Sequence, residues 1–376
     1  MSVEIVEVSD RRTLKRWLSF QYDLYADDPL FVPQLMGDEL DTMDPAKNPV
    51  FDVARARLLL AVEDGQSVGR VCGIIHGLET EKLGRKRGRF GWFECVDSAV
   101  VAEAMLAELE AWFRADGCAE MAGPLGFTDL DPEGLLIDGF DALPTIAGSY
   151  GKPYYPALLE GYGLTKEVDY QEFRIAIPPV DHPVVQTLRK KAARDQEKYG
   201  LRPLKLAHRK ELLAYVPQFW EVMERSFVQL YGVTPLTQAQ VDYYTKKYFG
   251  YIDPDFVQFV VDPGDRLVGF YVGIPSLSRA FQKAGGHLFP TGFWHVLRAF
   301  KSEDTVDFLL AGVDPDWSPS KVLPTLAVEM HRALVDRGVA CAETNHELET
   351  NTTVTGIWSK FEVMNTRRSR VHGKAL

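Results

Sequence analysis

The feature that most constrains this chain is an internal repeat. Residues 60–74 (LAVEDGQSVGRVCGI) and 260–274 (VVDPGDRLVGFYVGI) both read as two strands joined by a short turn rich in Asp and Gly. The Val-Gly pair that begins at Val68 recurs at Val268. Self-similarity at this distance indicates that one supersecondary unit occurs twice.

Two further matches follow in the same order along the chain. Residues 103–117 and 325–338 both read as helices that end in a glycine, and 158–164 resembles 357–363. The apolar residues of each helix fall on one face: Val101, Met105, Leu109 and Trp112 in the first, and Val322, Leu326, Met330 and Leu334 in the second. Three ordered matches predict a duplicated domain.

The predicted elements come in the same order in each half: strand, helices, three strands, helix, strand, helix and strand. This order is typical of a mixed α/β fold in which helices cover a twisted sheet. We therefore predict an α/β chain with an N-terminal domain over 1–180 and a C-terminal domain over 201–376. The charged segment 181–200 reads as a linker helix.

Composition argues against several classes of protein. A net charge of −11 opposes broad nucleic-acid binding, which depends on Lys and Arg neutralising phosphates. The four cysteines form no C-x-x-C pair, so neither a structural zinc site nor a disulfide framework is expected. The sequence shows neither an apolar run of membrane-spanning length nor a signal-like N-terminus, so we expect a cytoplasmic protein without a metal.

Two basic clusters stand out against this acidic total. They are Arg85, Lys86, Arg87 and Arg89 in the first half, and Arg367, Arg368, Arg370 and Lys374 near the C-terminus. Each cluster reads either as solvated loop charge or as a site for an anion such as a phosphate or a lipid headgroup.

The second half resembles the GNAT acyltransferases. Their acyl-CoA loop runs from a strand through Gly-Val-x-Pro-x-aromatic into a glycine-rich turn and then a helix. The matching residues here are Gly312, Val313, Pro315 and Trp317. The glycine-rich turn departs from the pattern, because Ser318 and Lys321 stand in it and Leu323 takes a glycine position.

This resemblance implies an acyl-CoA site in the second domain. A strand N–H near Val313 or Asp314 would contact the thioester carbonyl, and the start of the following helix would hold the pyrophosphate. Hydroxyls of Ser318 and Ser320 and the cation of Lys321 stand at that helix start. An ordinary helix cap is the alternative interpretation.

The last motif of the family is matched only in part near the C-terminus. Its positions are taken here by Asn351, Val354, Ile357, Trp358 and Lys360. The resemblance places Asn351 at the cofactor, and it places Trp358 where the family has a tyrosine that is said to protonate the departing thiolate. An indole cannot do this at neutral pH. The first half passes from strand to helix over 90–105 without a glycine loop, and so resembles a module that has lost its CoA site.

A longer resemblance covers most of the chain. Segments 27–51, 91–96, 123–141 and 150–164 are similar to a bacterial tandem GNAT family whose members near this pattern are ceramide synthases. The resemblance implies that a long acyl chain passes from acyl-CoA to the amine of 3-ketosphinganine or sphinganine, with peripheral contact to the inner membrane. Two alternatives stay open: an acetyltransferase for a small amine or peptide, and an inactive acyl-CoA- or lipid-binding protein.

A polar strand predicted over 339–351 offers candidate catalytic groups. Glu343 and Asn345 lie on one face of it and His346 on the other. Polar side chains in a central strand are costly unless they are paired or face a cavity. We predict Glu343 or His346 as the general base and Asn345 as the group that orients the acyl carbonyl. Paired or solvent-facing polar groups are the alternative.

In the first domain, Glu94 lies in an aromatic strand and is a further catalytic candidate. Carboxylates in the insertion 123–141 are candidates to recognise an ammonium or a hydroxyl, although Asp129 and Asp131 read as loop-forming turn residues. The candidate substrate-binding residues here are Asp138, Tyr150, Tyr154 and Tyr155. For the tyrosines, packing in the core is the alternative.

The insertion over 275–304 carries an apolar stripe at helical spacing. Its residues are Phe289, Phe293, Trp294, Leu297 and Phe300. The stripe indicates either a buried helix or a helix that covers a lipid tunnel or dips into a bilayer. In the second case, Phe293 and Trp294 are expected to contact the lipid substrate.

Overall fold

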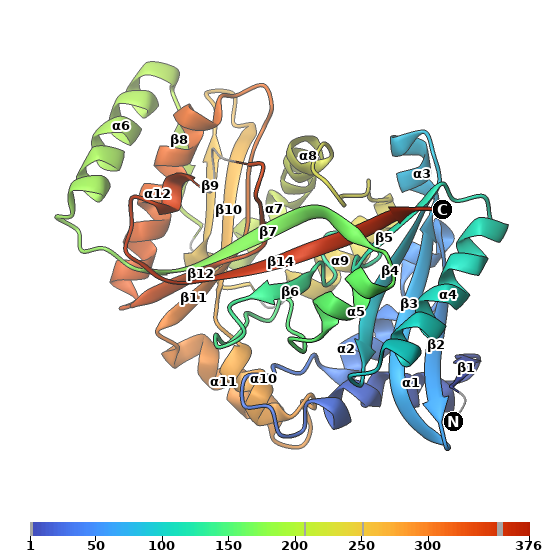
Figure 1. The fold of residues 1–376 in the computed structure, drawn as a ribbon. Helices are drawn as coiled ribbons and strands as arrows, with labels where there is room; N and C mark the ends of the chain where they lie inside the picture. The colour runs from blue at the N-terminus through green and yellow to red at the C-terminus, as the bar shows by residue number, and fades with distance from the viewer. Residues whose placement is uncertain (1–2, 207, 250–251, 352–355) are drawn as a thin grey trace. The chain divides into compact units, whose positions relative to one another are not determined.

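A computed structural model describes residues 3–206, 208–249, 252–351 and 356–376. The chain divides into two compact units. The first unit comprises Met1–Gln171, Ser278–His295 and Arg367–Leu376, and the second comprises Glu172–Leu277 and Val296–Thr366. Figure 1 shows the helices and strands of this mixed α/β chain, the fold class that the sequence predicts.

The first unit is built on an antiparallel run of strands in the order β1-β2-β3-β4, followed by β5 in parallel and β14 antiparallel. Its strands are β1 (Glu4–Glu7), β2 (Ala54–Glu63), β3 (Gln66–His76), β4 (Arg87–Cys95), β5 (Glu120–Gly123), β6 (Leu135–Asp138) and most of β7 (Thr165–Ala176) and β14 (Val363–Ala375). Its helices are α1 (Arg11–Leu24), α2 (Met36–Thr42), a 3₁₀ turn at Pro49–Asp52, α3 (Gly77–Leu83), α4 (Ala99–Ala115), α5 (Tyr155–Gly161), α10 (Ser278–Ala284) and the start of α11 (Gly292–Ser302).

The second unit has strands in the order β12-β11-β10-β9-β8, and only the pair β11 and β12 is parallel. Its strands are β8 (Arg202–Leu204), β9 (Val257–Val261), β10 (Leu267–Pro275), β11 (Thr305–Val313), β12 (Cys341–Thr344) and β13 (Glu347–Leu348). Its helices are α6 (Pro183–Tyr199), α7 (Arg209–Ala214), α8 (Val216–Phe227), α9 (Gln238–Tyr248), a 3₁₀ turn at Pro254–Phe256, and α12 (Pro319–Asp336).

The repeated pattern of the sequence appears as β2–β3 in the first unit and β9–β10 in the second. In the first hairpin Asp64 and Gly65 both have positive φ, 48° and 80°, which is the two-residue turn that right-twisted strands favour. The helix faces predicted for 103–117 and 325–338 are buried in α4 and α12, with Leu109 and Leu326 both fully enclosed. These predictions are confirmed.

The repeat has a glycine at the same position in both units, Gly69 and Gly269, and close packing against a helix explains it. A Cβ at Gly69 of β3 would lie 2.8 Å from Met105 of α4, and a Cβ at Gly269 of β10 would lie 2.6 Å from Val322 of α12. A larger residue would force these side chains to shift, because side-chain atoms do not approach within 3 Å. The same helix therefore packs on the same strand in both units.

Each unit takes its last strand from the other half of the sequence. In the first unit the end of β14 pairs with β5, with His372 opposite Gly123. In the second unit the end of β7 pairs with β12, with Arg174 opposite Glu343. Boundaries at 180 and 200 follow the repeat along the sequence and stay a prediction, whereas these units follow packing.

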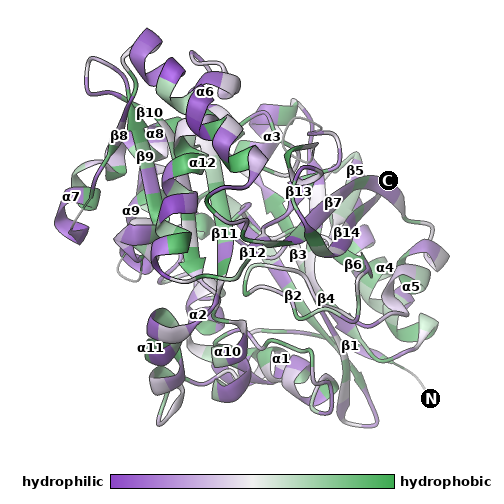
Figure 2. Ribbon diagram, turned by 90° about the vertical axis from the view of Figure 1, so that its left-hand side faces the viewer, coloured by the Kyte–Doolittle hydropathy of each residue, from purple (hydrophilic) through white to green (hydrophobic). Residues whose placement is uncertain are grey.

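The segment predicted as a linker helix is α6, which starts at Pro183 and is terminated by Gly200 in the left-handed conformation (φ 68°). It belongs to the second unit, where Gln196 Nε2 donates a hydrogen bond to Thr325 Oγ1 of α12 at 3.3 Å. Its surface is largely hydrophilic (Figure 2), as the charged sequence predicts.

Most residues of the two basic clusters lie on strands and are paired with carboxylates, whereas Arg85 and Lys86 are exposed loop charges, as one interpretation predicts. Arg89 is fully buried on β4 and Arg87 is nearly so, and carboxylates already neutralise them. On β14, Arg370 Nε lies 2.7 Å from Asp169 Oδ1, and Lys374 Nζ lies 2.8 Å from Glu110 Oε2. A strand position inside the sheet requires this pairing, because an unpaired buried cation is costly.

Candidate functional site

The parallel strands β11 and β12 of the second unit pair over only part of their length. Pairing ends where Phe308 lies opposite Thr344. Beyond it Asn345 N donates to Phe308 O at 3.0 Å, and Asn345 Nδ2 donates to Leu309 O at 3.3 Å. The predicted strand 339–351 is therefore wrong in extent, since it breaks at Asn345 into β12 and β13. β11 continues to Val313, and beyond Phe308 no strand in the described part of the chain pairs with its edge toward β12, which is called the open edge below.

The N–H of Val313 points to this open edge. The next residue, Asp314, donates its N–H to Val268 O of β10 at 2.9 Å. Successive N–H groups of a strand point to opposite sides, so the Val313 N–H points away from β10. Of the two N–H groups proposed from the sequence, only that of Val313 is directed to the open edge.

Asp314 instead holds the loop between β11 and α12. Its side chain is fully buried and accepts hydrogen bonds from Arg225 at 2.6 Å and from Arg266 at 2.7 Å. Its other oxygen accepts from Asp316 N at 2.9 Å. These contacts fix the path of the chain into α12.

The first turn of α12 presents polar groups to solvent. Ser318 is the N-cap residue, but its hydroxyl makes no capping bond and lies 2.9 Å from Ser320 Oγ. Lys321 places its ammonium 4.6 Å from the centre of the Tyr199 ring, and Leu323 packs inward against the core. Helix N–H groups, two hydroxyls and a cation at one helix start fit a phosphate group.

The predicted bases have partners of their own. Glu343 Oε1 lies 2.9 Å from Arg174 Nη1, so this carboxylate is already engaged in an ion pair. His346 Nε2 lies 2.7 Å from Glu172 Oε1, and both side chains are largely buried. Asn345 was expected to orient an acyl carbonyl, but its side-chain Nδ2 donates a hydrogen bond to Leu309 O. Asn351 lies just beyond β13, its N–H donating to Leu348 O at 2.9 Å, and Val354 lies outside the described residues.

Sequence reasoning did not select Glu347, which the structure pairs with Trp358. The indole Nε1 donates to both oxygens of this carboxylate, at 2.7 and 2.8 Å. Burial raises the pKa of Glu347 to about 8, and the bond from Trp358 opposes that rise. The half-buried Tyr271 lies nearby, and the Trp358 ring stacks near Phe308 at 6.4 Å. The sequence offered one indication of this pair: a tryptophan at the position of the family's tyrosine, close in sequence to several glutamates.

The matching strand end in the first unit is occupied by side chains. Val96 N donates to Val68 O at 2.9 Å, as Asp314 N does to Val268 O, so Cys95 corresponds to Val313. The Cys95 N–H donates to the hydroxyl of Tyr155 at 3.2 Å. The group that would face a carbonyl in this unit is therefore already bound.

The half-buried carboxylate of Glu94 holds that tyrosine in place. Tyr155 and Tyr25 donate to the same oxygen of Glu94, at 2.6 and 2.7 Å. Burial raises the pKa of Glu94, while Arg70 and the two hydroxyls lower it. The Tyr154 hydroxyl donates to Cys95 O at 2.8 Å. The predicted residues Glu94, Tyr154 and Tyr155 therefore lie together at the end of β4.

Tyr150 reaches the same cluster through other residues. Its hydroxyl donates to Asp28 Oδ1 at 2.9 Å, and Asp28 also contacts Lys152 at 3.3 Å. The Lys152 ammonium lies 4.5 Å from the centre of the Tyr25 ring. Asp138, in contrast, is exposed at the end of β6, where its side chain accepts from Gly139 N at 3.0 Å.

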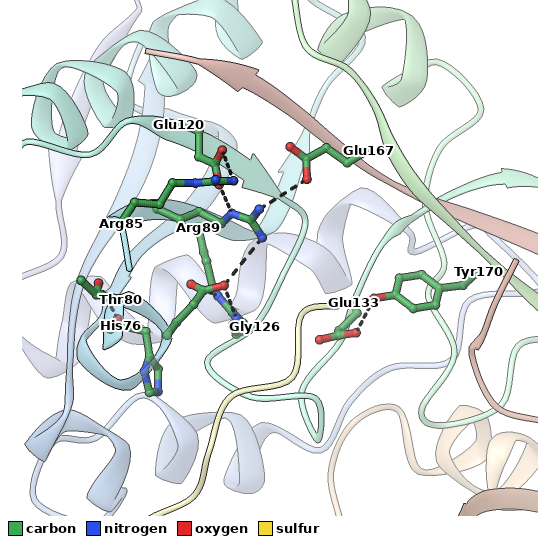
Figure 3. A network of polar contacts seen from close by, with 11 residues as sticks. His76, Thr80, Arg85, Arg89, Glu120, Gly126, Glu133, Glu167 and Tyr170 are labelled. Atoms are coloured by element: carbon green, nitrogen blue, oxygen red, sulfur yellow. Dashed lines mark hydrogen bonds and ion pairs between the residues drawn. The ribbon is translucent and has the colours of Figure 1, made fainter. Parts of the chain in front are cut away.

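A second polar network lies at the other end of β4 (Figure 3). Arg89 donates to both oxygens of Glu79, at 2.7 and 2.8 Å, and to Gly126 O at 3.2 Å. Arg85 and Arg87 both contact Glu120, at 3.0 and 2.7 Å. The network ties β4 to the insertion that follows β5, so it is structural.

Glu133 of that insertion has an unusual environment. Tyr170 donates to its Oε2 at 3.0 Å, and its buried Oε1 has no hydrogen-bond partner among the described residues. Burial, with Asp129 nearby, raises the pKa of Glu133 to about 8. Asp131 accepts from Thr128 N at 3.0 Å, the loop role that the sequence predicts for it.

The apolar stripe of 275–304 is not buried, so that alternative is wrong. Phe289, Trp294 and Leu297 are 79%, 64% and 51% exposed. Phe293 is half-buried and packs between Phe289 and Trp294, with ring centres 5.9 and 4.7 Å apart. None of the helices in the described part of the chain is long and apolar enough to cross a membrane, and no cluster of metal-binding side chains occurs there.

Comparison with curated proteins gives two full-length matches at the same identity. The chain is 26% identical to the bacterial ceramide synthase of Caulobacter vibrioides, over all of this chain and 98% of that protein. It is also 26% identical to protein YghO of Escherichia coli, over 98% of this chain and 94% of that protein. No family model matches the chain.

Solved structures confirm the predicted tandem fold. A tandem GNAT protein from the clavulanic acid biosynthesis pathway matches all of this chain and 98% of its own, with a TM-score of 0.55 at 10% identity. A GCN5-related N-acetyltransferase from Sphaerobacter thermophilus matches 99% of this chain and 95% of its own, with a TM-score of 0.51 at 12% identity. Together with the sequence matches, these comparisons support an acyltransferase.

Proposed function

We propose that this chain, an acyltransferase with the tandem GNAT fold, transfers a long acyl chain from acyl-CoA to the amine of a sphingoid base, 3-ketosphinganine or sphinganine. The observation that carries the proposal is the open edge of β11 beside Val313, combined with full-length similarity to a ceramide synthase. The proposal assigns a cytoplasmic protein that meets its lipid substrate at the inner membrane.

The thioester is assigned to the second unit. Transfer from a thioester to an amine requires stabilisation of a tetrahedral oxyanion, and a preorganised strand N–H serves this purpose. The Val313 N–H is directed to an open edge, whereas the corresponding Cys95 N–H is bound to Tyr155. The first turn of α12, with Ser318, Ser320 and Lys321, is assigned to the CoA phosphates.

Glu347 is assigned the proton transfer. The amine arrives as an ammonium and must lose a proton before it attacks, and the thiolate must be protonated as it leaves. A carboxyl with a pKa near 8 accepts and returns a proton close to neutral pH. Glu343 is less suited to this task, because it is already engaged in an ion pair with Arg174.

The balance of atoms is simple. The amine nitrogen bonds to the acyl carbon and the carbon–sulfur bond breaks. The ammonium loses two protons on the way to the amide: one passes to Glu347 and then to the CoA sulfur, and the other is released to solvent. Asn345 Oδ1, buried and without a partner among the described residues, is assigned to accept a hydrogen bond from the substrate amine.

A lipid-product assay tests the proposal. The full chain is incubated with palmitoyl-CoA and either 3-ketosphinganine or sphinganine, and the products are analysed by mass spectrometry. We expect the corresponding amide and release of free CoA. An amide formed only from acetyl-CoA and a small amine would replace this function with the acetyltransferase alternative, and no amide from any pair would reject both.

A further inference from the structure

The segment from α10 through α11 (278–302) combines exposed aromatic side chains with an absence of acidic residues. It presents the two most exposed large apolar side chains among the described residues, Phe289 at 79% and Trp294 at 64%. It also lies within a stretch, from 266 to 302, that contains no aspartate or glutamate. The whole chain has 53 acidic residues and a net charge of −11, so this stretch departs from the rest.

The base of the segment is firmly attached within the first unit. Gln282 Nε2 donates to Pro29 O at 2.9 Å and to Phe31 O at 3.1 Å. Gly286 O accepts from Met36 N at 2.9 Å, and a Cβ at Gly286 would lie 2.4 Å from the Tyr22 ring. The segment therefore leaves a fixed base, and its exposed aromatic residues follow directly from it.

The exposed face of α11 alternates apolar and basic side chains. Trp294, Leu297, Arg298 and Lys301 stand at positions i, i+3, i+4 and i+7, so they share one face of the helix, and all four are exposed. Figure 2 shows both hydrophobic and hydrophilic residues along α11. A helix with Trp and Leu among cations on its outer face has the pattern of segments that lie in a membrane interface.

The cations of the segment have no acidic partners among the residues that the structure describes. Arg279, Lys283, Arg298 and Lys301 are all exposed, and none forms an ion pair with a residue in the described ranges. In contrast, basic residues elsewhere in the protein, such as Arg370 and Lys374, form ion pairs with carboxylates. Four unpaired cations around exposed aromatic rings are complementary to a negatively charged surface with an apolar interior.

We propose that the 278–302 segment docks this protein on the surface of an anionic phospholipid bilayer, with Phe289, Trp294 and Leu297 inserted among the lipids and the four cations at the headgroups. The inference deepens the proposed function, because it names the element that would bring the enzyme to a lipid acceptor. Docking itself needs no catalysis, so it is tested separately.

The experiment measures binding of the full chain to vesicles by co-sedimentation. One set of vesicles is pure phosphatidylcholine, and the other contains about a third phosphatidylglycerol. We expect binding to the anionic vesicles that is at least about tenfold tighter than to the neutral ones, and that weakens as salt rises, since each cation near the surface contributes about 1 kcal/mol.

Two double variants separate the apolar and the electrostatic contributions. The variant that combines Trp294→Ser with Leu297→Ser should weaken binding to anionic vesicles at least about tenfold. The variant that combines Arg298→Glu with Lys301→Glu should weaken this binding at least about tenfold and should also abolish its salt dependence. Val100→Ser is the matched control, since Val100 is 63% exposed on α4 and should bind like the unchanged protein. All these positions are exposed, and thermal melting verifies that each variant folds.

Several results would overturn the inference. The unchanged protein failing to bind anionic vesicles would do so, as would normal binding by both double variants. A concentration-dependent dimer that disappears in the Trp294→Ser, Leu297→Ser variant would show instead that this face joins two copies of the chain. Amide formation from a detergent-dispersed acceptor is measured in parallel, so loss of the proposed activity and loss of docking are distinguished.

Discussion

The ends of β4 and β11 occupy the same place in the two units, and they differ in one hydrogen bond. At the end of β4, the Cys95 N–H is bound to the hydroxyl of Tyr155, which Glu94 holds. At the end of β11, the Val313 N–H is directed to an open edge. The difference teaches that two units with the same strand and helix arrangement differ at the strand end, and under our proposal only the second unit keeps an N–H available for a thioester carbonyl.

The polar groups around the two strand ends follow the same division. In the first unit a carboxylate and two tyrosines satisfy one another in a closed, buried cluster. In the second unit the half-buried carboxylate of Glu347 accepts hydrogen bonds from Trp358, and burial raises its pKa to about 8. Substitutions in the first cluster should therefore change stability, and substitutions in the second should change catalysis.

The largest effect is expected for Glu347→Gln. Removing a group that moves protons should lower kcat by about 10²–10⁴-fold with little change in stability. The unchanged enzyme should gain activity as pH rises through about 8, because the carboxyl must be ionised to accept a proton. Steady-state rates across pH measure both effects. Glu94→Gln is the matched variant in the first unit. An equal fall of kcat in this variant would indicate that the carboxylate at the end of β4 takes part in catalysis.

Glu133→Gln should change the pH dependence of stability. The pKa of Glu133 is raised in the folded state to about 8 from an ordinary value near 4.5, so the folded protein holds a proton that the unfolded chain loses. Stability of the unchanged protein should fall between these two values, by a few kcal/mol at about 1.4 kcal/mol per pKa unit. Urea unfolding at pH 5 and pH 8 should show that glutamine removes most of this fall. A fall of the same size in the variant would contradict the assignment.

Tyr155→Phe should destabilise the first unit. It leaves the Cys95 N–H and one bond to the half-buried Glu94 unsatisfied, which should lower the free energy of unfolding by about 1–3 kcal/mol. Because the cluster is assigned no chemistry, kcat should stay within about twofold. Tyr154→Phe removes one bond to a backbone carbonyl and serves as the milder control. A hundredfold loss of kcat in a folded Tyr155→Phe protein would show that this cluster reacts with substrate.

The smallest effect is expected for Lys321→Ala. Loss of one cation at the start of α12 should raise KM for acyl-CoA about tenfold and leave kcat unchanged, since a charge-assisted hydrogen bond contributes about 1.5–3 kcal/mol. Lys198→Ala is the control, because its ammonium lies 5.2 Å from the centre of the same Tyr199 ring but stands on α6. Equal changes of KM in the two variants would contradict the assignment of the CoA phosphates to the first turn of α12.

Local patterns in the sequence were enough to predict the repeat and its packing. The turn at Asp64 and Gly65 and the buried faces of α4 and α12 depend on neighbours within a few residues, so periodicity and turn chemistry identify them. The sequence also located the β11 strand end, because Gly312 and Val313 fit a family motif.

Features that depend on distant residues were not predictable in this way. The Cys95–Tyr155 bond joins positions 60 residues apart, and the pairing of Glu343 with Arg174 spans 169. The exchange of β7 and β14 between the units is likewise a tertiary property. Exposure of Trp294 was ambiguous for another reason: an apolar stripe has the same spacing whether or not another element covers it.

The assignment of the thioester to the second unit has a direct test in amide hydrogen exchange. The full chain is compared with and without a non-hydrolysable palmitoyl-CoA analogue, and peptides covering 305–321 and 87–105 are followed by mass spectrometry. We predict slowed exchange across Val313 and the first turn of α12, and unchanged exchange across Cys95. Protection of the β4 peptide, or of neither peptide at saturating analogue, would contradict the account.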